Sequence, residues 1–351
     1  MKKEKNNVND TTTSNNKTME YNNNVTKSII NQTATDIDNE STLEHEAYIL
    51  VRKAENKLKR RCCIYSLFHS KNERFIDSCD LYRKAGEKYK MCNQWKKAGL
   101  CFENCALIKI KIKESPVNFY KQSYACFSKI DIGDDSKKIF DKMNQSLEKE
   151  GEYFQIGKNN ENLAIEKENK KKYDEAINFY LQAIKYYEKD GKHESLITKL
   201  QIKLAELMMV HNHPDGPKKV PTMLENVGNS YLKKMITKYT AKEYFGKAIL
   251  SSIYYSNNPS DGRKYYEKFN KIDKSFIESS IYTLCNDIIT SMENNDINSM
   301  KISIRKYKEI CGVDEFMAFI LAKLIEKMKS KCNIRESTGD DFTNDEDNSI
   351  Q

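Results

Sequence analysis

A short amphipathic helix pattern that recurs along the chain limits the possible fold more than any other feature. Its clearest copy, from Tyr173 to Gly191, reads YDEAINFYLQAIKYYEKDG. Small and large apolar residues alternate there at the spacing of one helix face, namely at Ala176, Ile177, Tyr180, Ala183, Ile184 and Tyr187. Small residues let a neighbouring helix come close, and the aromatic rings fill the space beside them. This pattern is typical of the second helix of a tetratricopeptide-like repeat.

Looser copies of the pattern occur both before and after this segment. They lie at residues 78–90, 93–107, 115–130, 239–255 and 261–272. Because they follow one another at hairpin-like intervals of ~35–45 residues, we expect an all-α fold built as a stack of helical hairpins. The alternative is an ordinary helical bundle without repeats. A hairpin stack is usually a binding surface and rarely a catalyst.

The sequence contains no motif that would carry catalytic chemistry or a cofactor. It lacks a phosphate-binding G-x-x-x-x-G-K-[ST] loop, an H-E-x-x-H zinc motif and a G-x-S-x-G nucleophile motif. We therefore expect no enzyme activity, no catalytic residues and no cofactor. His211 and His213 invite a metal interpretation, but Asp215 is the one carboxylate close by, so we expect no metal site.

Cysteine usage and hydropathy indicate a cytoplasmic protein. The ten cysteines do not have the spacing of a zinc site, and Cys79, Cys101, Cys105 and Cys126 fall on apolar helix faces, where a reduced thiol behaves as a small hydrophobe. No run of 18 apolar residues is present, and the N-terminus lacks the apolar core of a secretory signal. We expect free thiols and at most peripheral attachment to membranes.

Charge is distributed unevenly along the chain. The net charge is +8, but residues 1–40 carry −1 and residues 333–351 carry −5, which leaves +14 on the body between them. A body this basic predicts an acidic partner, whether an acidic protein, an anionic lipid surface or a nucleic acid. Nucleic acid is the least favoured, because the aromatic residues lie at core spacing and do not alternate with the lysines as base stacking requires.

Four segments can be distinguished along the chain. Residues 1–40 include ten Asn and few large apolar groups, which predicts a disordered tail. Residues 41–270 form the hairpin solenoid, residues 271–332 a C-terminal helical bundle, and residues 333–351 an acidic flexible tail. The prolines are expected at helix starts or in loops, and residues 211–221, HNHPDGPKKVP, are expected to form the longest interior loop.

A run of apolar residues interrupts the solenoid directly after a basic helix end. CCIYSLF occupies residues 62–68 and follows a stretch with six Lys or Arg between residues 52 and 61. One interpretation is a short turn that folds back into the core. The other is an exposed loop that enters an anionic membrane surface, with the basic residues attracting the headgroups. The candidate contact residues are Cys62, Cys63, Ile64, Tyr65, Leu67 and Phe68, and the two cysteines are also possible acylation sites.

Several phrases resemble the soluble NSF attachment protein (SNAP) family, and most closely its alpha type. The nearest is KYTAKEYFGKAIL at residues 238–250, and others lie at residues 54–70, 90–99, 264–273 and 319–330. The resemblance covers about residues 42–351 and is weakest at 131–170. It implies a right-handed superhelical stack of tetratricopeptide-like hairpins that ends in a helical bundle. Members of this family wrap a SNARE four-helix complex, of syntaxin-type and related chains, and recruit the hexameric AAA ATPase NSF to take it apart.

The resemblance also implies roles for particular residues. The expected SNARE-binding residues are Lys199, Lys203, Lys238, Lys242 and Lys247. Two pairs of them, at 199/203 and 238/242, have the i, i+4 spacing of one helix face. The apolar loop at 62–68 corresponds to the membrane-contact loop of the family, although Cys-Cys-Ile-Tyr replaces its aromatic and Gly pattern. The acidic tail, with Asp345, Glu346, Asp347 and Ile350, corresponds to the NSF-binding end, where the family has a penultimate Leu.

Two other functions stay open on the sequence alone. A generic tetratricopeptide-like scaffold would bind a single extended peptide as well as a folded bundle. An RNA-binding helical repeat would account for the basic body. The sequence does not separate an alpha from a beta type, and the N-terminal extension lies outside the family pattern.

Overall fold

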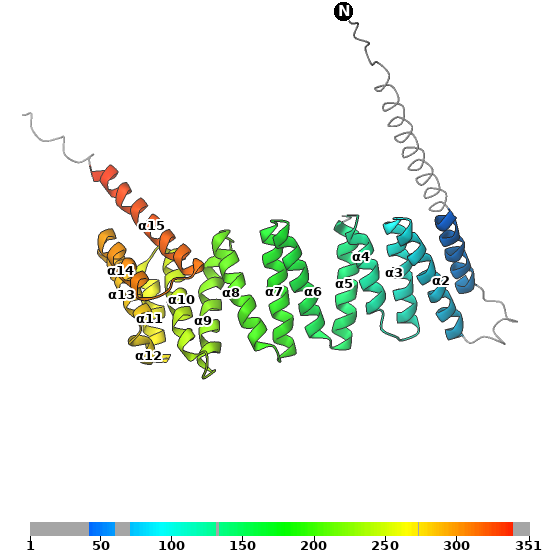
Figure 1. Cartoon of the computed structure of the whole chain (residues 1–351), viewed down its shortest axis with the longest axis horizontal. Helices are drawn as coiled ribbons and strands as arrows, with labels where there is room; N and C mark the ends of the chain where they lie inside the picture. The colour runs from blue at the N-terminus through cyan, green and yellow to red at the C-terminus, as the bar shows by residue number, and fades with distance from the viewer. Residues whose placement is uncertain (1–41, 60–70, 131–132, 273, 340–351) are drawn as a thin grey trace, which may run out of the picture. The chain divides into compact units, whose positions relative to one another are not determined.

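The structure is a computed structural model, and it describes residues 42–59, 71–130, 133–272 and 274–339 (Figure 1). Within these ranges the chain forms helices and turns and no β-strand. Consecutive helices pack against each other in adjacent pairs. The expected all-α architecture of helical hairpins is therefore confirmed, whereas the handedness of the stack stays a prediction. The described residues divide into two compact units, one up to Gly151 and one from Glu152 onward.

The first unit begins with a helix over residues 42–59. It continues with α2 (Lys71–Met91), α3 (Trp95–Lys111), α4 (Val117–Ser128) and α5 (Gly133–Glu150), each packed on the one before. Small residues lie against rings, as at Gly99, where an added Cβ would come within 2.8 Å of the Phe127 ring. Cys79, Cys101, Cys105 and Cys126 are buried in this unit as free thiols, so the expected apolar positions are confirmed.

The second unit holds the clearest repeat and all helices after it. Its elements are α6 (Tyr153–Asn169), α7 (Tyr173–Asp190), α8 (Glu194–Val210), α9 (Gly216–Leu232), the 3-10 helix η2 (Lys238–Thr240), α10 (Ala241–Ser256), α11 (Pro259–Ile272), α12 (Lys274–Ile277), α13 (Ser280–Glu293), α14 (Ile297–Ile310) and α15 (Glu315–Gly339). Apolar side chains from α6 through α15 form one continuous core.

The α6–α7 hairpin shows why the repeat pattern works. All six residues predicted for the packed face of α7 are buried. Gly157 of α6 lies so close to the Tyr187 ring that an added Cβ would be 2.6 Å from it. The phenol of Tyr187 donates a hydrogen bond to Glu161 at 2.7 Å, and that of Tyr180 donates to Glu168, also at 2.7 Å. The rings therefore fill the space left by the small residues and keep their polar ends satisfied.

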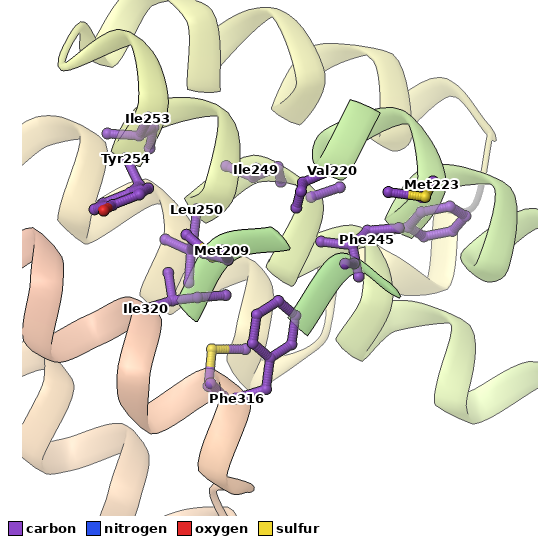
Figure 2. Close-up of a cluster of buried hydrophobic side chains, with 14 of the residues drawn as sticks. Met209, Val220, Met223, Phe245, Ile249, Leu250, Ile253, Tyr254, Phe316 and Ile320 are labelled. Carbon is purple, nitrogen blue, oxygen red and sulfur yellow. The ribbon is translucent and has the colours of Figure 1, made fainter. Parts of the chain in front are cut away.

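The C-terminal helices share a core with the helices before them. Figure 2 shows Leu250 of α10 beside Met209 of α8 and Ile320 of α15, within the continuous cluster of buried residues. Helix α10 packs on α9, α11, α13 and α15. Residues on both sides of position 270 therefore belong to one compact unit, and the division into a solenoid up to residue 270 and a helical bundle from residue 271 stays a prediction.

Helix ends agree with the sequence in some places and differ in others. Gly191 ends α7 in the left-handed conformation at φ 73°, and Gly151 follows α5 at φ 77°, as expected for glycines that end helices. The loop predicted at residues 211–221 is wrong, because α9 begins at Gly216 and includes Pro217 and Pro221. Pro217 lies in the first turn, where proline is tolerated, but Pro221 lies inside the helix and is buried, so the expectation that the prolines lie at helix starts or in loops is wrong for Pro221.

The predicted tails lie largely outside the described residues. This holds for the N-terminal tail at residues 1–40 and for most of the acidic tail. Helix α15 continues to Gly339, past the predicted end of the bundle at residue 332.

Candidate functional site: a basic surface on the second unit

Helix α8 presents two lysines on one exposed face. Lys199 and Lys203 lie one turn apart on this helix, and both are exposed, as their spacing predicts. Lys203 forms an ion pair with Glu168 at 3.0 Å, and its ammonium lies 5.9 Å from the centre of the Tyr180 ring. Within the described ranges, Lys199 has no ion-pair partner. Its charge is therefore the more available of the two for an acidic partner.

Lys238 and Lys242 are four positions apart in the sequence, but they do not share an α-helix. Lys238 opens η2, whereas Lys242 is the second residue of α10. The prediction that both lie on one α-helix face is therefore wrong, because the hydrogen bond from Thr240 N to Thr237 O, at 2.9 Å, tightens the chain before α10 begins. Lys238 is exposed, and the half-buried Lys242 holds its ammonium 5.7 Å from the Tyr239 ring centre.

The lysines at positions 199, 203, 238 and 242 are called the basic surface from here on. Lys247 does not belong to it. Its side chain is 4% exposed, and its ammonium forms an ion pair with Asp314, which lies just before α15. The ammonium also lies 4.9 Å from the Tyr244 ring centre and 5.7 Å from that of Phe316. The prediction that Lys247 contacts a partner is corrected accordingly, because its position on α10 faces the core and its charge is already paired within the protein.

One lysine that the sequence did not point to connects the turn after α9 with α8. Lys234 follows α9, and its ammonium donates a hydrogen bond to the Ser195 hydroxyl at the start of α8, 3.2 Å away. Ser195, Lys199 and Lys203 follow one another at four-residue spacing, so the turn after α9 adjoins the exposed face of α8. No local pattern in the sequence could have revealed this contact, because the two residues are 39 positions apart.

Two other predicted sites fall outside the described residues. They are the apolar loop with Cys62, Cys63, Ile64, Tyr65, Leu67 and Phe68, and the acidic end with Asp345, Glu346, Asp347 and Ile350. The basic helix before the loop is described up to residue 59. Arg52 pairs there with Glu55 at 3.2 Å and Lys57 pairs with Asp77, while Lys53 and Lys59 are exposed.

The described residues bring together no cluster suited to metal binding, since no group of three or more His, Cys, Asp or Glu side chains converges among them. The two histidines that invited a metal interpretation contact an aromatic ring and a backbone amide. His211 stacks on Tyr173 with ring centres 3.6 Å apart, and His213 Nδ1 accepts a hydrogen bond from the Asp215 amide at 3.2 Å. Of the helices in these ranges, none combines the length and apolar character needed to cross a bilayer.

Comparison with known proteins identifies the family. A sequence model of the soluble NSF attachment protein (SNAP) family matches residues 45–329, from the first described helix into α15. The chain belongs to the soluble NSF attachment protein family. The SNAP match extends into both compact units and includes all the lysines of the basic surface.

Individual SNAP relatives align with most of the chain at modest identity. The vesicular-fusion protein SEC17 of Komagataella phaffii is 28% identical over 306 residues, which cover 86% of this chain and 99% of that protein. The human alpha-soluble NSF attachment protein is 22% identical over 290 residues, or 80% of this chain and 94% of the human protein. The bovine beta-soluble NSF attachment protein is 21% identical over 288 residues, covering 80% and 93%.

Proposed function

We propose that this protein is an adaptor that binds assembled SNARE complexes and recruits the ATPase NSF to disassemble them during vesicle fusion and intracellular transport. The observation that carries the proposal is the SNAP-family match over residues 45–329, on a chain whose described part is a stack of helical hairpins. The names of the relatives, a vesicular-fusion protein and an alpha-soluble NSF attachment protein, support the same role. In this role the protein is not itself an enzyme.

The basic surface of the second unit is the proposed SNARE contact. Lys199 and Lys238 are exposed and have no ion-pair partner in the described part of the chain, and Lys203 and Lys242 are their neighbours on α8 and α10. Such a surface attracts an acidic four-helix complex over several ångströms, and salt screens this attraction. SNARE binding is therefore expected to weaken as ionic strength rises.

Two further contacts belong to the proposal through the family pattern. The acidic end, with Asp345, Glu346, Asp347 and Ile350, is the proposed NSF contact, with Ile350 in place of the family's penultimate Leu. The apolar loop at residues 62–68 is the proposed contact with an anionic membrane surface. The exposed Lys53 and Lys59 on the helix before it supply part of the positive charge that such a surface attracts. Protein acting in this way is cytoplasmic and peripherally associated with membranes.

A binding experiment separates this proposal from the generic scaffold and from RNA binding. The full chain is titrated with a pre-assembled SNARE four-helix complex, with each SNARE segment alone, and with an unrelated structured RNA. The adaptor binds the assembled complex, binds the single segments far more weakly, and does not bind the RNA at physiological salt. Equal affinity for a single extended segment would favour the scaffold, and preferential RNA binding would overturn the adaptor proposal.

A further inference from the structure

Two cysteines face each other across the α2–α3 interface of the first unit. Helices α2 and α3 pack side by side (Figure 1). The thiol of Cys105 on α3 donates a hydrogen bond to the backbone carbonyl of Cys79 on α2 at 3.3 Å, and the Cys79 thiol donates to the Cys105 carbonyl at 4.0 Å. The two thiols also lie within hydrogen-bonding reach of each other. Each sulfur therefore lies beside the other cysteine, and the two residues are called the thiol pair below.

The backbones of α2 and α3 come close together along the same interface. An added Cβ at Gly86 of α2 would lie 2.9 Å from the Phe102 ring of α3. A disulfide forms only where two backbones approach closely and the two sulfurs face each other. The reciprocal contacts between thiols and carbonyls show that both conditions are met at the thiol pair.

The surroundings of the thiol pair make one of its members the more reactive. The hydrogen bond with Cys105 lowers the pKa of the Cys79 thiol, although burial alone would raise it. The charges of Lys109 and Arg83 also lower this pKa, and the carboxylate of Asp80 raises it. The pKa of the Cys105 thiol is raised by the same hydrogen bond and by burial. Because the thiolate is the nucleophilic form of cysteine, Cys79 is the residue that reacts first.

The sulfur of Cys79 lies at the edge of the core of the first unit. Cys79 is 4% exposed, whereas Cys105 is fully buried. Asp80 and Arg83, which follow Cys79 on α2, form an exposed ion pair at 3.6 Å. A small oxidant such as hydrogen peroxide therefore reaches Cys79 when the helices open locally.

Cys101 and Cys126 lie in the same core but in different surroundings. Burial raises the pKa of the Cys101 thiol to about 12 and that of the Cys126 thiol to about 11. Both thiols therefore stay protonated at neutral pH and are poor nucleophiles. They are equally buried cysteines against which the reactivity of the thiol pair can be compared.

We propose that Cys79 and Cys105 form an oxidative modification site, at which a hydroperoxide converts the two thiols into a disulfide between α2 and α3. The Cys79 thiolate first attacks one oxygen of hydrogen peroxide, so that the O–O bond breaks and Cys79 becomes a sulfenic acid. The hydroxide that leaves takes up the proton that Cys79 released. The Cys105 sulfur then attacks the Cys79 sulfur, the S–S bond forms, the S–O bond breaks, and the Cys105 proton leaves with the oxygen as water. Two thiols and one peroxide thus give one disulfide and two waters.

The disulfide acts on the stability of the first unit. It links residues that are 26 positions apart, and closing such a loop lowers the entropy of the unfolded chain. Oxidation is therefore expected to raise the thermal unfolding midpoint, and reduction should reverse the change. This inference does not depend on the proposed SNARE-binding function, because no residue of the basic surface takes part in it.

The test uses the full chain, first reduced and then treated with a small excess of hydrogen peroxide. Remaining thiols are alkylated, and the non-reduced tryptic peptides are mapped by mass spectrometry. We expect a linked pair of peptides that joins Cys79 to Cys105, about 2 Da lighter than the two reduced peptides together and separated by dithiothreitol. The Cys105→Ala variant should instead accumulate a sulfenic acid at Cys79, which dimedone traps. The matched control Cys101→Ala/Cys126→Ala should form the disulfide like the wild type.

The wild-type peptide map decides the question even if a variant unfolds, and circular dichroism checks the helix content of each variant. If Cys79 and Cys105 both stay open to alkylation after peroxide treatment, the proposal is overturned. A preferential link between Cys101 and Cys126 would overturn it as well. A folded Cys105→Ala protein that gives no dimedone adduct at Cys79 would contradict the proposed order of the two steps and the site with it.

Discussion

The ammonium of Lys247 on α10 forms an ion pair with the carboxylate of Asp314, which also caps α15. The other Asp314 carboxylate oxygen accepts a hydrogen bond from the Met317 amide at 2.8 Å, in the first turn of α15. One aspartate therefore joins two helices that lie far apart in the sequence. A lysine that resembles a surface residue in the sequence thus holds the last helix of the second unit in place.

We predict that Lys247→Ala lowers stability and leaves partner binding intact. The variant loses the ion pair and the packing of the lysine stem, so its free energy of unfolding should fall by about 1–3 kcal/mol. Asp314 is 58% exposed and stays hydrated, so no unpaired charge is buried. Urea unfolding measures the loss, with the exposed Lys238→Ala as the control that should not change stability. If Lys247→Ala has normal stability but binds SNARE complex more weakly, then Lys247 contacts the partner and the correction made above is wrong.

The α6–α7 hairpin predicts an unusual response to a glycine substitution. Gly157→Ala in a helix normally adds about 1 kcal/mol of stability through helix propensity. Here the new Cβ would lie 2.6 Å from the Tyr187 ring, so we expect a net loss of about 1–3 kcal/mol. Thermal or urea unfolding measures the change in stability. The control is Asn162→Ala at an exposed position of the same helix, which raises helix propensity without a steric clash. If Gly157→Ala stabilises the protein, the close approach of α6 and α7 is not as the structure describes it.

The half-buried Glu206 on α8 gives a prediction about pH. Burial raises the pKa of this carboxyl above its usual value of 4.5, although Lys247 acts in the opposite direction. The folded state therefore holds the proton more tightly than the unfolded chain. This contribution to stability is fully present below the unfolded pKa and is lost as pH rises through the folded pKa.

Glu206→Gln should consequently be more stable than the wild type near neutral pH. The difference should vanish below about pH 4, where the wild-type carboxyl is protonated in both states. Urea unfolding at a series of pH values checks this, and the exposed Glu309→Gln on α14 serves as the control. A Glu206→Gln protein that is less stable than the wild type at neutral pH would show that the charged carboxylate is favoured in the fold.

The proposed SNARE contact predicts a salt-dependent effect of charge reversal. Lys199→Glu should raise the dissociation constant for the assembled SNARE complex about three- to ten-fold at low salt, and less at high salt where the charges are screened. Because Lys199 is exposed, stability should be unchanged. Titration at several ionic strengths measures the effect, and Lys301→Glu on α14 is the control. Equal losses in the two variants would mean that overall charge, and not this surface, determines binding.

The acidic C-terminal end predicts a defect that leaves SNARE binding unchanged. Ile350→Ala removes most of the apolar side chain proposed to contact NSF, so stimulation of NSF ATPase activity should fall several-fold. Ile350→Leu restores the residue type of the family and should stimulate normally. Steady-state ATP hydrolysis by NSF measures both variants on immobilised SNARE complex. Normal stimulation by Ile350→Ala would show that the tail assignment is wrong.

The features that could be predicted from the sequence are local ones. The packed face of α7 follows from residues within a few turns of each other, and Gly191 ends that helix because its left-handed conformation suits glycine. Exposure of Lys199 and Lys203 follows from the same periodicity. The proposed adaptor function follows from the resemblance to the SNAP family, because no single motif in the sequence specifies it.

The features that could not be predicted depend on distant contacts or on turn geometry. Burial of Lys247 requires Asp314, 67 positions further on. Lys238 and Lys242 lie on different elements because one 3-10 turn comes before α10. Helix α9 begins at Gly216 and includes the buried Pro221, although a proline inside a helix is normally unfavourable.

ATP-dependent disassembly is the most direct test of the proposed function. Purified full-length protein is added to a fluorescently labelled, pre-assembled SNARE four-helix complex together with NSF, and separation of the SNARE chains is followed over time. We expect chain separation that requires this protein, NSF and hydrolysable ATP together. If the protein binds the complex but NSF and ATP release no SNARE chains, the proposed adaptor function is contradicted.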